Sequence, residues 1–397
     1  MRIAFVVQRY GADVLGGAES LCRWVAERMQ KYCDVEVLTT CALDYLTWAD
    51  HFPAGESSVN NVPVRRFPVD SPRDMKRFNV FARQLFANPQ RTLPDELTWL
   101  KMQGPYSSSL LTYIKEHEAH YNLFIFVTYS YATTFLGLQL VPQKSILIPA
   151  AHDEPHFHFA AFQPLFHLPR GIIYNTNEER RLVHEHWHNE HVPCCVAGVG
   201  IEDAENAVKS NEYDSEETER ISLPEKYLLY VGRIDIMKGC RELITSFLRY
   251  QNEYENDLHL VLVGKQAMDI PEHPKIHTPG FVMESQKSEI LRRASIVVNP
   301  SEYESLSLLI LEAWQENVPV LVNGRSDVLV EHCLTSNGGL YYGNYEEFAL
   351  CVELLRSRPD VRQTLGQNGH NYVAERYSLD TVEKIYIDFI TQIAQTL

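Results

Sequence analysis

Short apolar runs followed by helix-like segments recur along this chain, and this alternation constrains the fold more than any other feature. The clearest runs are rich in Val, Ile, Leu or Phe and cover residues 3–7, 123–127, 145–148, 227–231, 258–263 and 296–298. Runs this short and this apolar are typical of strands buried on both faces. Strands that alternate with helices form parallel sheets with right-handed crossovers. The sequence therefore predicts an α/β fold built on parallel sheets.

Length and composition narrow the class of protein. The 397 residues are enough for two domains, and the apolar fraction of 45% is that of an ordinary globular protein. The net charge of −16 argues against nucleic acid as a principal partner, because phosphate binding needs a basic surface. The eight cysteines include no Cys-x-x-Cys pair. They therefore favour buried free thiols in a reducing cytosol over a disulfide framework.

Two apolar segments have features of targeting or membrane segments. The N-terminal run is too short for a signal sequence, so we expect it to be the first strand. Residues 121–143 contain no charged side chain and have the length of a membrane span. Polar residues interrupt this segment, however, and we expect a buried strand at 123–127 followed by a short helix from Ala132.

The stretch Asn299–Trp314 carries the strongest functional pattern. It follows the apolar run 296–298, and Ser305 or Ser307 is the expected N-cap of a helix. Glu304 and Glu312 stand eight residues apart, which corresponds to roughly 12 Å if the chain between them is helical. The free N–H groups of the first turn would attract an anion such as a pyrophosphate. The alternative is an amphipathic helix with two incidental acids.

Three further strand ends carry residues suited to binding. The turn Gly16-Gly17 opens a helix expected at 20–29, and its glycine spacing fits neither the dinucleotide fingerprint nor a P-loop. His152 follows the run 145–148, at the end of a strand where doubly wound folds bind ligands. Arg233 and Lys238 follow the run 227–231 and could clamp a leaving diphosphate.

The full string from Pro300 to Ala313 closely resembles the Glu-x7-Glu motif of retaining glycosyltransferases of the GT-B fold, in particular glycosyltransferase family 4. Pro300-Ser301, Glu304 and Leu311-Glu312-Ala313 stand where that family has them, although Leu306-Ser307 replaces a common Phe-Gly. The resemblance implies two doubly wound, Rossmann-like parallel-sheet domains facing each other across a cleft. We expect an N-terminal domain at 1–200, a donor-binding domain at 201–378 and a terminal helix at 379–397 that crosses back.

The resemblance also implies roles for individual residues. In the family, the turn matching Gly16-Gly17 approaches the donor phosphates, and the histidine matching His152 contacts the donor sugar, with Asp153 as its expected support. The cations matching Arg233 and Lys238 take the diphosphate. The remaining expected contacts are Glu304 on sugar hydroxyls, Glu312 on the ribose, Phe281 and the Val282 backbone at the nucleobase, and the amides of Ser305, Leu306 and Ser307 at the phosphates. For Phe281, a place in the core is the alternative.

The implied activity is retaining transfer of a hexose from a nucleoside diphosphate to an acceptor hydroxyl. The chain contains no Asp-x-Asp sequence, so we expect metal-independent catalysis and no cofactor. UDP-glucose is the preferred donor, and GDP-mannose stays open. The expected acceptor is a saccharide or a lipid-linked saccharide in cell-surface polysaccharide synthesis, which places the protein in the cytoplasm.

Residues 73–91 form a second, weaker pattern. Arginines and lysines alternate there with apolar side chains, as in a basic amphipathic helix. Such a helix could lie on an anionic membrane or face an acidic acceptor, and the alternative is a solvated helix face. The five cations are Arg73, Lys76, Arg77, Arg83 and Arg91.

Two other readings compete with an enzyme of this family. The chain could be a relative that binds nucleotides or carbohydrates without catalysis, although the complete Arg, Lys and Glu set speaks against that. The string His184-Glu185-His186-Trp187-His188 matches the zinc peptidase pattern His-Glu-x-x-His, but no third ligand follows at the usual distance. We expect a polar surface helix there, and a solvated acidic linker at 202–219.

Overall fold

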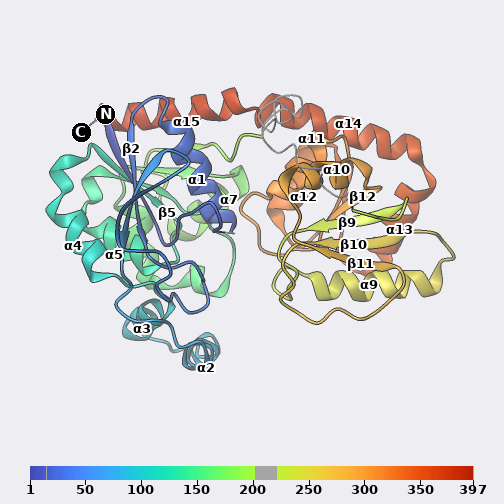
Figure 1. Ribbon diagram of the computed structural model, residues 1–397, viewed down its shortest axis with the longest axis horizontal. Coiled ribbons are helices and arrows are strands. Elements are labelled where there is room, and N and C mark those ends of the chain that lie inside the picture. Colours follow the sequence, from blue (N-terminus) through green and yellow to red (C-terminus); the bar gives the residue numbers. More distant parts are fainter. Residues whose placement is uncertain (15, 202–220, 397) are drawn as a thin grey trace. The chain divides into compact units, whose positions relative to one another are not determined.

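The computed structural model describes residues 1–14, 16–201 and 221–396, so the expected acidic linker lies outside the described residues. The chain divides into two compact units (Figure 1). Unit 1 comprises Met1–Val199 and Glu383–Leu397, and unit 2 comprises Gly200–Val382. Each unit contains one largely parallel sheet with helices in its connections. The predicted α/β fold class is confirmed.

The sheet of unit 1 has the strand order β3-β4-β2-β1-β5-β6-β7-β8. Neighbouring strands are parallel except β3 and β4, which are antiparallel and joined at Asn60-Asn61, both with positive φ. This hairpin interrupts the alternation of strands and helices, and positive φ at both turn positions is the geometry of a tight two-residue hairpin. The strands are β1 Arg2–Val7, β2 Asp34–Thr40, β3 Gly55–Val59, β4 Val62–Phe67, β5 Leu123–Val127, β6 Ser145–Ile148, β7 Gly171–Tyr174 and β8 Cys194–Val196.

The core of unit 1 surrounds β1, whose residues from Ile3 to Val7 are fully buried between β2 and β5. The uncharged segment forms the buried strand β5 and a helix from Ala132, as predicted. No described helix is long and apolar enough to cross a membrane. The helices are α1 Gly17–Met29, α2 Met75–Phe86, α3 Leu93–Gln103, α4 Ser108–Glu116, α5 Ala132–Leu140, α6 Gln163–His167 and α7 Asn177–Trp187.

The sheet of unit 2 is parallel throughout its described strands, with the order β11-β10-β9-β12-β13-β14. The chain starts at β9, adds strands on one side, then returns to add β12 on the other side. Doubly wound sheets bind their ligands at the carboxyl ends of the strands where the order reverses. The strands are β9 Tyr227–Val231, β10 His259–Val263, β11 Ile276–Gly280, β12 Ile296–Asn299, β13 Val320–Asn323 and β14 Gly339–Tyr342.

Helix α11 is held in place by close packing on α14. Trp314 in α11 is fully buried, and its ring N–H donates to the carbonyl of Gly338 at 2.9 Å. A Cβ atom at Gly369 in α14 would lie 2.0 Å from the Trp314 ring, so only glycine permits this approach. The later helices are α9 Cys240–Glu253, α10 Glu284–Arg293, α11 Leu308–Gln315, α12 Asp327–Ser336, α13 Tyr345–Ser357, α14 Pro359–Arg376 and α15 Leu379–Ala394.

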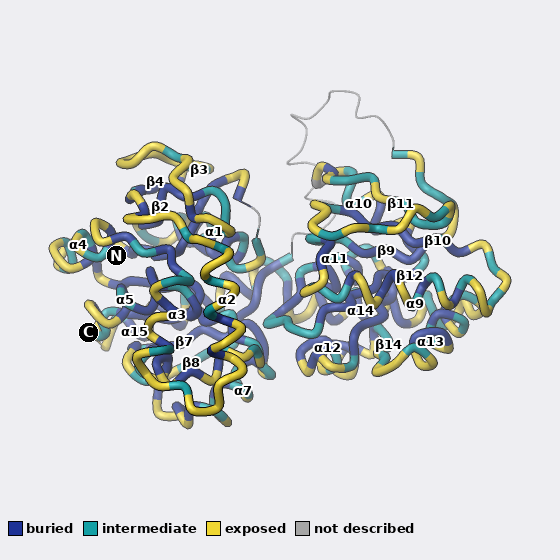
Figure 2. The backbone as a smooth tube through the Cα atoms, turned by 90° about the horizontal axis from the view of Figure 1, so that it is seen from below, coloured by how far each residue is buried: buried dark blue, intermediate teal, exposed yellow. Residues whose placement is uncertain are grey.

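The part of α15 that belongs to unit 1 packs on α1. Glu383 accepts a hydrogen bond from Lys31 at 2.9 Å, and the Tyr386 hydroxyl donates to the carbonyl of Gly198 at 3.0 Å. Figure 2 shows the sheet strands β9 and β12 as mainly buried, whereas α2 is mainly exposed. All eight cysteines are free thiols, half of them buried and half partly buried.

Candidate functional site

The loop after β9 brings Arg233 and Lys238 to the carboxyl end of the unit 2 sheet. The Asp235 carboxylate forms an ion pair with Arg233 and accepts a hydrogen bond from the Lys238 backbone N–H at 2.8 Å. Gly239 has a left-handed φ of 74°, and a Cβ atom there would lie 2.2 Å from the carbonyl oxygen of Pro300. The loop after β9 and the loop after β12 are therefore in direct contact.

This contact brings together two residues that the sequence predicted for one site. The Lys238 Nζ atom lies 2.8 Å from the Glu304 Oε1 atom, and both side chains stay partly exposed. Strands β9 and β12, which lead to the two residues, are neighbours at the reversal of the strand order. An ammonium group and a carboxylate thus lie side by side where a doubly wound sheet binds ligands.

The sequence offered two N-caps, Ser305 and Ser307, for the helix of the Glu-x7-Glu stretch, and the structure uses the second. The helix starts at Leu308 with Ser307 as N-cap, so Ser305 is not the cap. Residues 304–307 are not helical, and the helical rise therefore does not set the separation of Glu304 and Glu312. Ser307 has a left-handed φ of 97°, and its hydroxyl accepts a hydrogen bond from the Asn299 side chain at 2.9 Å. The hydrogen bond between Asn299 and Ser307 therefore helps to fix where α11 begins.

Glu312, in the middle of α11, has a partner that sequence reasoning missed. The Lys287 Nζ atom on α10 lies 2.8 Å from the Glu312 Oε1 atom. Phe281 and Val282 follow β11, where Phe281 is 70% exposed and Val282 is buried. The alternative that Phe281 belongs to the core is therefore wrong.

In unit 1, Gly16 is the N-cap of α1, which begins at Gly17 and so three residues earlier than expected. The buried carboxylate of Glu19 accepts hydrogen bonds from Gln8 and Arg9, both at 2.9 Å. A Cβ atom at Gly16 would lie 2.2 Å from Glu19, whereas Gly17 faces open space. The buried Glu19 carboxylate therefore disfavours a side chain at position 16, whereas a Cβ atom at position 17 would have no neighbouring atom within 4 Å.

His152 lies in the loop after β6, two strands from β1 in the sheet of unit 1. Its Nε2 atom lies 3.6 Å from the Glu154 Oε2 atom, and its Nδ1 atom lies 3.4 Å from the carbonyl oxygen of Ala150. Asp153, the expected support, instead has its Oδ1 atom 2.6 Å from the Nε2 atom of His158. The carboxylate beside His152 is therefore that of Glu154, because the side chain of Asp153 is turned toward His158.

The geometry gives the zinc peptidase alternative no support. Helix α7 ends at Trp187, and His188 adopts a left-handed conformation beyond it, so His184 and His188 do not share a helical face. Within the residues that the structure describes, no group of His, Cys, Asp or Glu could hold a metal ion.

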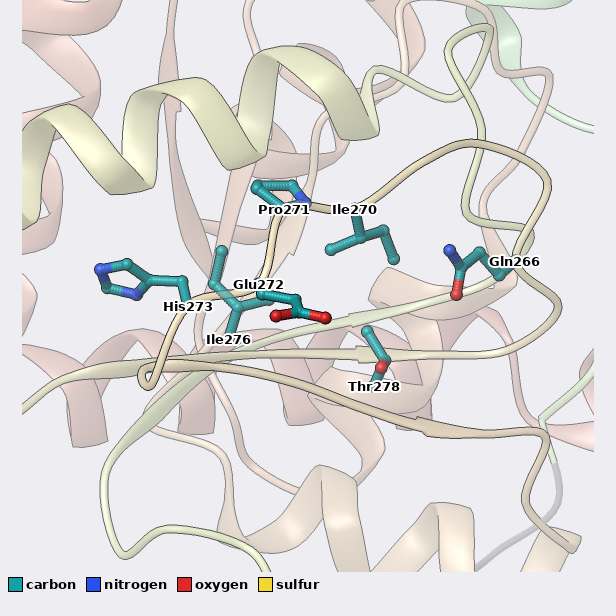
Figure 3. A pocket seen from close by; sticks show the side chains of 7 residues that line it. All are labelled: Gln266, Ile270, Pro271, Glu272, His273, Ile276 and Thr278. Carbon is teal, nitrogen blue, oxygen red and sulfur yellow. The ribbon is translucent and has the colours of Figure 1, made fainter.

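A small open pocket lies apart from these residues, under the loop between β10 and β11. Its volume is about 320 Å³, and none of the candidate residues lines it (Figure 3). The side chains around it are Gln266, Ile270, Pro271, Glu272, His273, Ile276 and Thr278.

Comparison with known proteins gives a partial match to one family. Residues 213–372, less than half of the chain, match the family model of glycosyl transferases group 1. An uncharacterised glycosyltransferase of Methanocaldococcus jannaschii is 27% identical over 172 residues, which cover 40% of this chain and 43% of that protein. The lipopolysaccharide core glycosyltransferase LpsE of Rhizobium meliloti is 24% identical over 41% of this chain and 49% of its own length. This chain thus matches less than half the length of these curated relatives.

Solved structures resemble the whole chain at low sequence identity. Sucrose-phosphate synthase from Thermosynechococcus elongatus has a TM-score of 0.71 and 15% identity, covering 100% of both chains. The HepE protein of Anabaena in complex with UDP-glucose has a TM-score of 0.64 and 14% identity, covering 100% of this chain and 99% of that one. Both likenesses confirm the predicted GT-B fold.

Proposed function

We propose that this protein is a retaining glycosyltransferase that moves a hexose from a nucleoside diphosphate to a hydroxyl of a saccharide or a lipid-linked acceptor. The observation that carries this proposal is the contact between Lys238 and Glu304 at the strand-order reversal of unit 2, with Arg233 in the same loop as Lys238. The non-catalytic alternative predicts nucleotide binding without turnover.

The proposed chemistry places charge stabilisation on the donor-binding unit. As the bond between the sugar C1 atom and the diphosphate breaks, negative charge grows on the departing phosphate. Lys238, Arg233 and the backbone amides of residues 305–307 would neutralise this charge, with the amides of Gly16 and Gly17 as further donors. The acceptor oxygen bonds to C1 on the same face, and the departing phosphate oxygen takes the acceptor proton. Because the chain lacks Asp-x-Asp, we propose that this step needs no metal ion.

The remaining contacts follow the family pattern. Glu304 and His152 would hold the donor sugar, Glu312 the ribose, and Phe281 with the Val282 backbone the nucleobase. The 70% exposure of the Phe281 side chain is consistent with a ring available for stacking on a base. UDP-glucose is the preferred donor, because HepE was solved with UDP-glucose, and GDP-mannose is the second choice. The likeness to the lipopolysaccharide core glycosyltransferase LpsE supports a role in cell-surface polysaccharide synthesis.

A panel of nucleotide sugars tests the proposal. The purified protein should release UDP from one hexose donor in buffer containing EDTA, and the sugar product should keep the anomeric configuration of the donor. Proton NMR of the product, recorded before mutarotation, reads this configuration. Inversion, or tight nucleotide binding without release from any donor, would refute the proposal.

We also propose that α2 lets the protein rest on an anionic membrane. Two of the five cations noted in the sequence are engaged elsewhere: Arg73 donates to the carbonyl oxygens of residues 45 and 46, and Arg91 pairs with Glu96 at 3.2 Å. The other three, on α2, are exposed, and they flank Val80, which is 57% exposed. Basic and exposed apolar side chains on one helix fit an anionic lipid surface.

Co-sedimentation with vesicles tests this surface. Vesicles containing phosphatidylglycerol should carry down the protein, and vesicles of phosphatidylcholine alone should not. Reversal of the three charges in Lys76→Glu, Arg77→Glu and Arg83→Glu should abolish the binding, because each basic side chain near the surface contributes about 1 kcal/mol. Equal binding by this triple variant would rule out α2 as the contact.

A further inference from the structure

The loop that carries His152 is anchored at its backbone by a buried carboxylate. Glu179, near the start of α7, is almost fully buried, and its Oε1 atom accepts a hydrogen bond from the Ala151 backbone N–H at 2.6 Å. Its Oε2 atom accepts one from the Asn175 backbone N–H, also at 2.6 Å. One side chain thus ties the loop after β6 to the turn after β7. The backbone that leads into His152 is therefore fixed.

A second carboxylate, that of Glu154, lies beside the ring of His152. The Glu154 Oε2 atom lies 3.6 Å from the His152 Nε2 atom, which is within ion-pair range but longer than a hydrogen bond. Contacts of this kind often tighten when a ligand binds. The same carboxylate accepts a hydrogen bond from the buried Tyr129 hydroxyl at 3.0 Å. It also lies 3.0 Å from the Nε2 atom of His156.

The groups around Glu154 are themselves held by aromatic packing. The His156 ring stacks on the ring of Trp99, with centroids 4.8 Å apart, and lies near Tyr129, whose side chain is fully buried. Burial alone would raise the pKa of Glu154, but His156, His152 and the Tyr129 hydroxyl outweigh it and lower this pKa to about 2. Glu154 is therefore an ionised carboxylate at neutral pH. Its position is set by three neighbours.

A fixed carboxylate beside an imidazole sets the orientation and the tautomer of the ring, as in catalytic triads. We propose that Glu154 is a positioning residue for His152: its carboxylate sets the orientation of the imidazole ring through the Nε2 atom that faces it. The inference rests on the proposed function, in which His152 contacts the donor sugar. Asp153, which the sequence suggested for this task, is exposed and pairs with His158. A substitution of Asp153 is thus a matched control for a substitution of Glu154.

A kinetic cycle tests the positioning role. Glu154→Gln keeps the shape of the side chain and removes its charge, and it should lower kcat about 10- to 100-fold, the size expected from a misplaced catalytic contact. The KM for the donor should change little, and Asp153→Asn should stay near wild type. In the His152→Ala background, Glu154→Gln should cause no further loss, because it acts through the histidine. An undiminished further loss in that background would overturn the inference, as would near wild-type turnover of Glu154→Gln when His152→Ala is impaired.

Nitrogen NMR of the labelled histidines gives a readout that does not depend on turnover. The ring signals of His152, assigned by their loss in His152→Ala, should move in Glu154→Gln and stay in place in Asp153→Asn. Circular dichroism checks that each variant is folded. If no donor is turned over but the signals move as expected, the proposed function fails and the positioning role stands. If the signals do not respond to Glu154→Gln, the positioning role is wrong whatever the donor results show.

Discussion

Among single residues, the candidate donor site consists of charged side chains that are paired with one another. Lys238 lies against Glu304, Arg233 against Asp235, and Lys287 lies 2.8 Å from Glu312. Such pairs hold flexible side chains in place, and the cations keep donors available for an incoming phosphate. The pairing also keeps these cations from repelling one another in the free protein.

Removal of the Lys238 ammonium group should impair the chemical step. Lys238→Ala is expected to cost about 3 kcal/mol or more of transition-state stabilisation, which is at least about a 100-fold loss in kcat/KM. Steady-state kinetics with the preferred donor measure this loss. The control is Lys226→Ala, which removes an exposed lysine of unit 2 paired with Asp257 at 2.7 Å. Near wild-type turnover of Lys238→Ala would refute the assignment.

Removal of the Glu312 carboxylate should chiefly weaken nucleotide binding. A hydrogen bond to a charged group contributes about 1.5–3 kcal/mol, so Glu312→Ala should lower the affinity for UDP at least about 10-fold. Isothermal titration calorimetry measures this affinity. Glu316→Ala removes another carboxylate at the end of α11, one paired with Arg292 at 2.8 Å, and should leave the affinity unchanged. Equal affinities for the wild type and Glu312→Ala would count against the ribose assignment.

Among the elements, the bounds of buried strands were predictable from the sequence, whereas the start of α11 was not. The strands β5 and β9 have the predicted bounds, because short apolar runs identify buried strands directly. The start of α11 depends on the contact of Asn299 with Ser307, and Glu312 pairs with a lysine from another helix. Contacts of this kind come from tertiary structure and leave no local pattern. The missed hairpin at Asn60-Asn61 did carry a local signal, two turn-forming residues between short runs.

The packing of α12 and α14 should make stability depend on pH through His332. Burial lowers the pKa of His332 to about 4, against an unperturbed value of about 6.5. The folded state therefore holds this ring neutral, and its contribution to stability is complete above about pH 6.5 and lost as the pH falls toward 4. At pH 4 the loss should approach about 3 kcal/mol.

Urea unfolding of the wild type and of His332→Phe at several pH values isolates this contribution. The wild type should lose more stability than the variant between pH 6.5 and pH 4. His120→Gln, a change of an exposed histidine, should follow the wild type. Parallel pH dependence in the wild type and His332→Phe would contradict the assignment.

At the scale of the whole molecule, the two units contribute different kinds of groups to the proposed reaction. In our proposal, unit 2 would supply Arg233, Lys238, the start of α11 and Glu312, and unit 1 would supply the Gly16-Gly17 turn and His152. The fold class was predictable from the alternation of strands and helices. The expected partner of His152 was not, because adjacent carboxylates at 153 and 154 are equivalent in sequence and only the surrounding Tyr129 and His156 select Glu154.

The central claim is that Arg233, Lys238 and the start of α11 bind the donor diphosphate without a divalent ion. A crystal structure of the protein with UDP, grown in the presence of EDTA, tests it most directly. We expect the diphosphate within hydrogen-bond distance of the Lys238 Nζ atom, the Arg233 guanidinium and the backbone amides of residues 305–307. A nucleotide bound elsewhere, or those two side chains turned away from its phosphates, would show that these groups do not form the donor site.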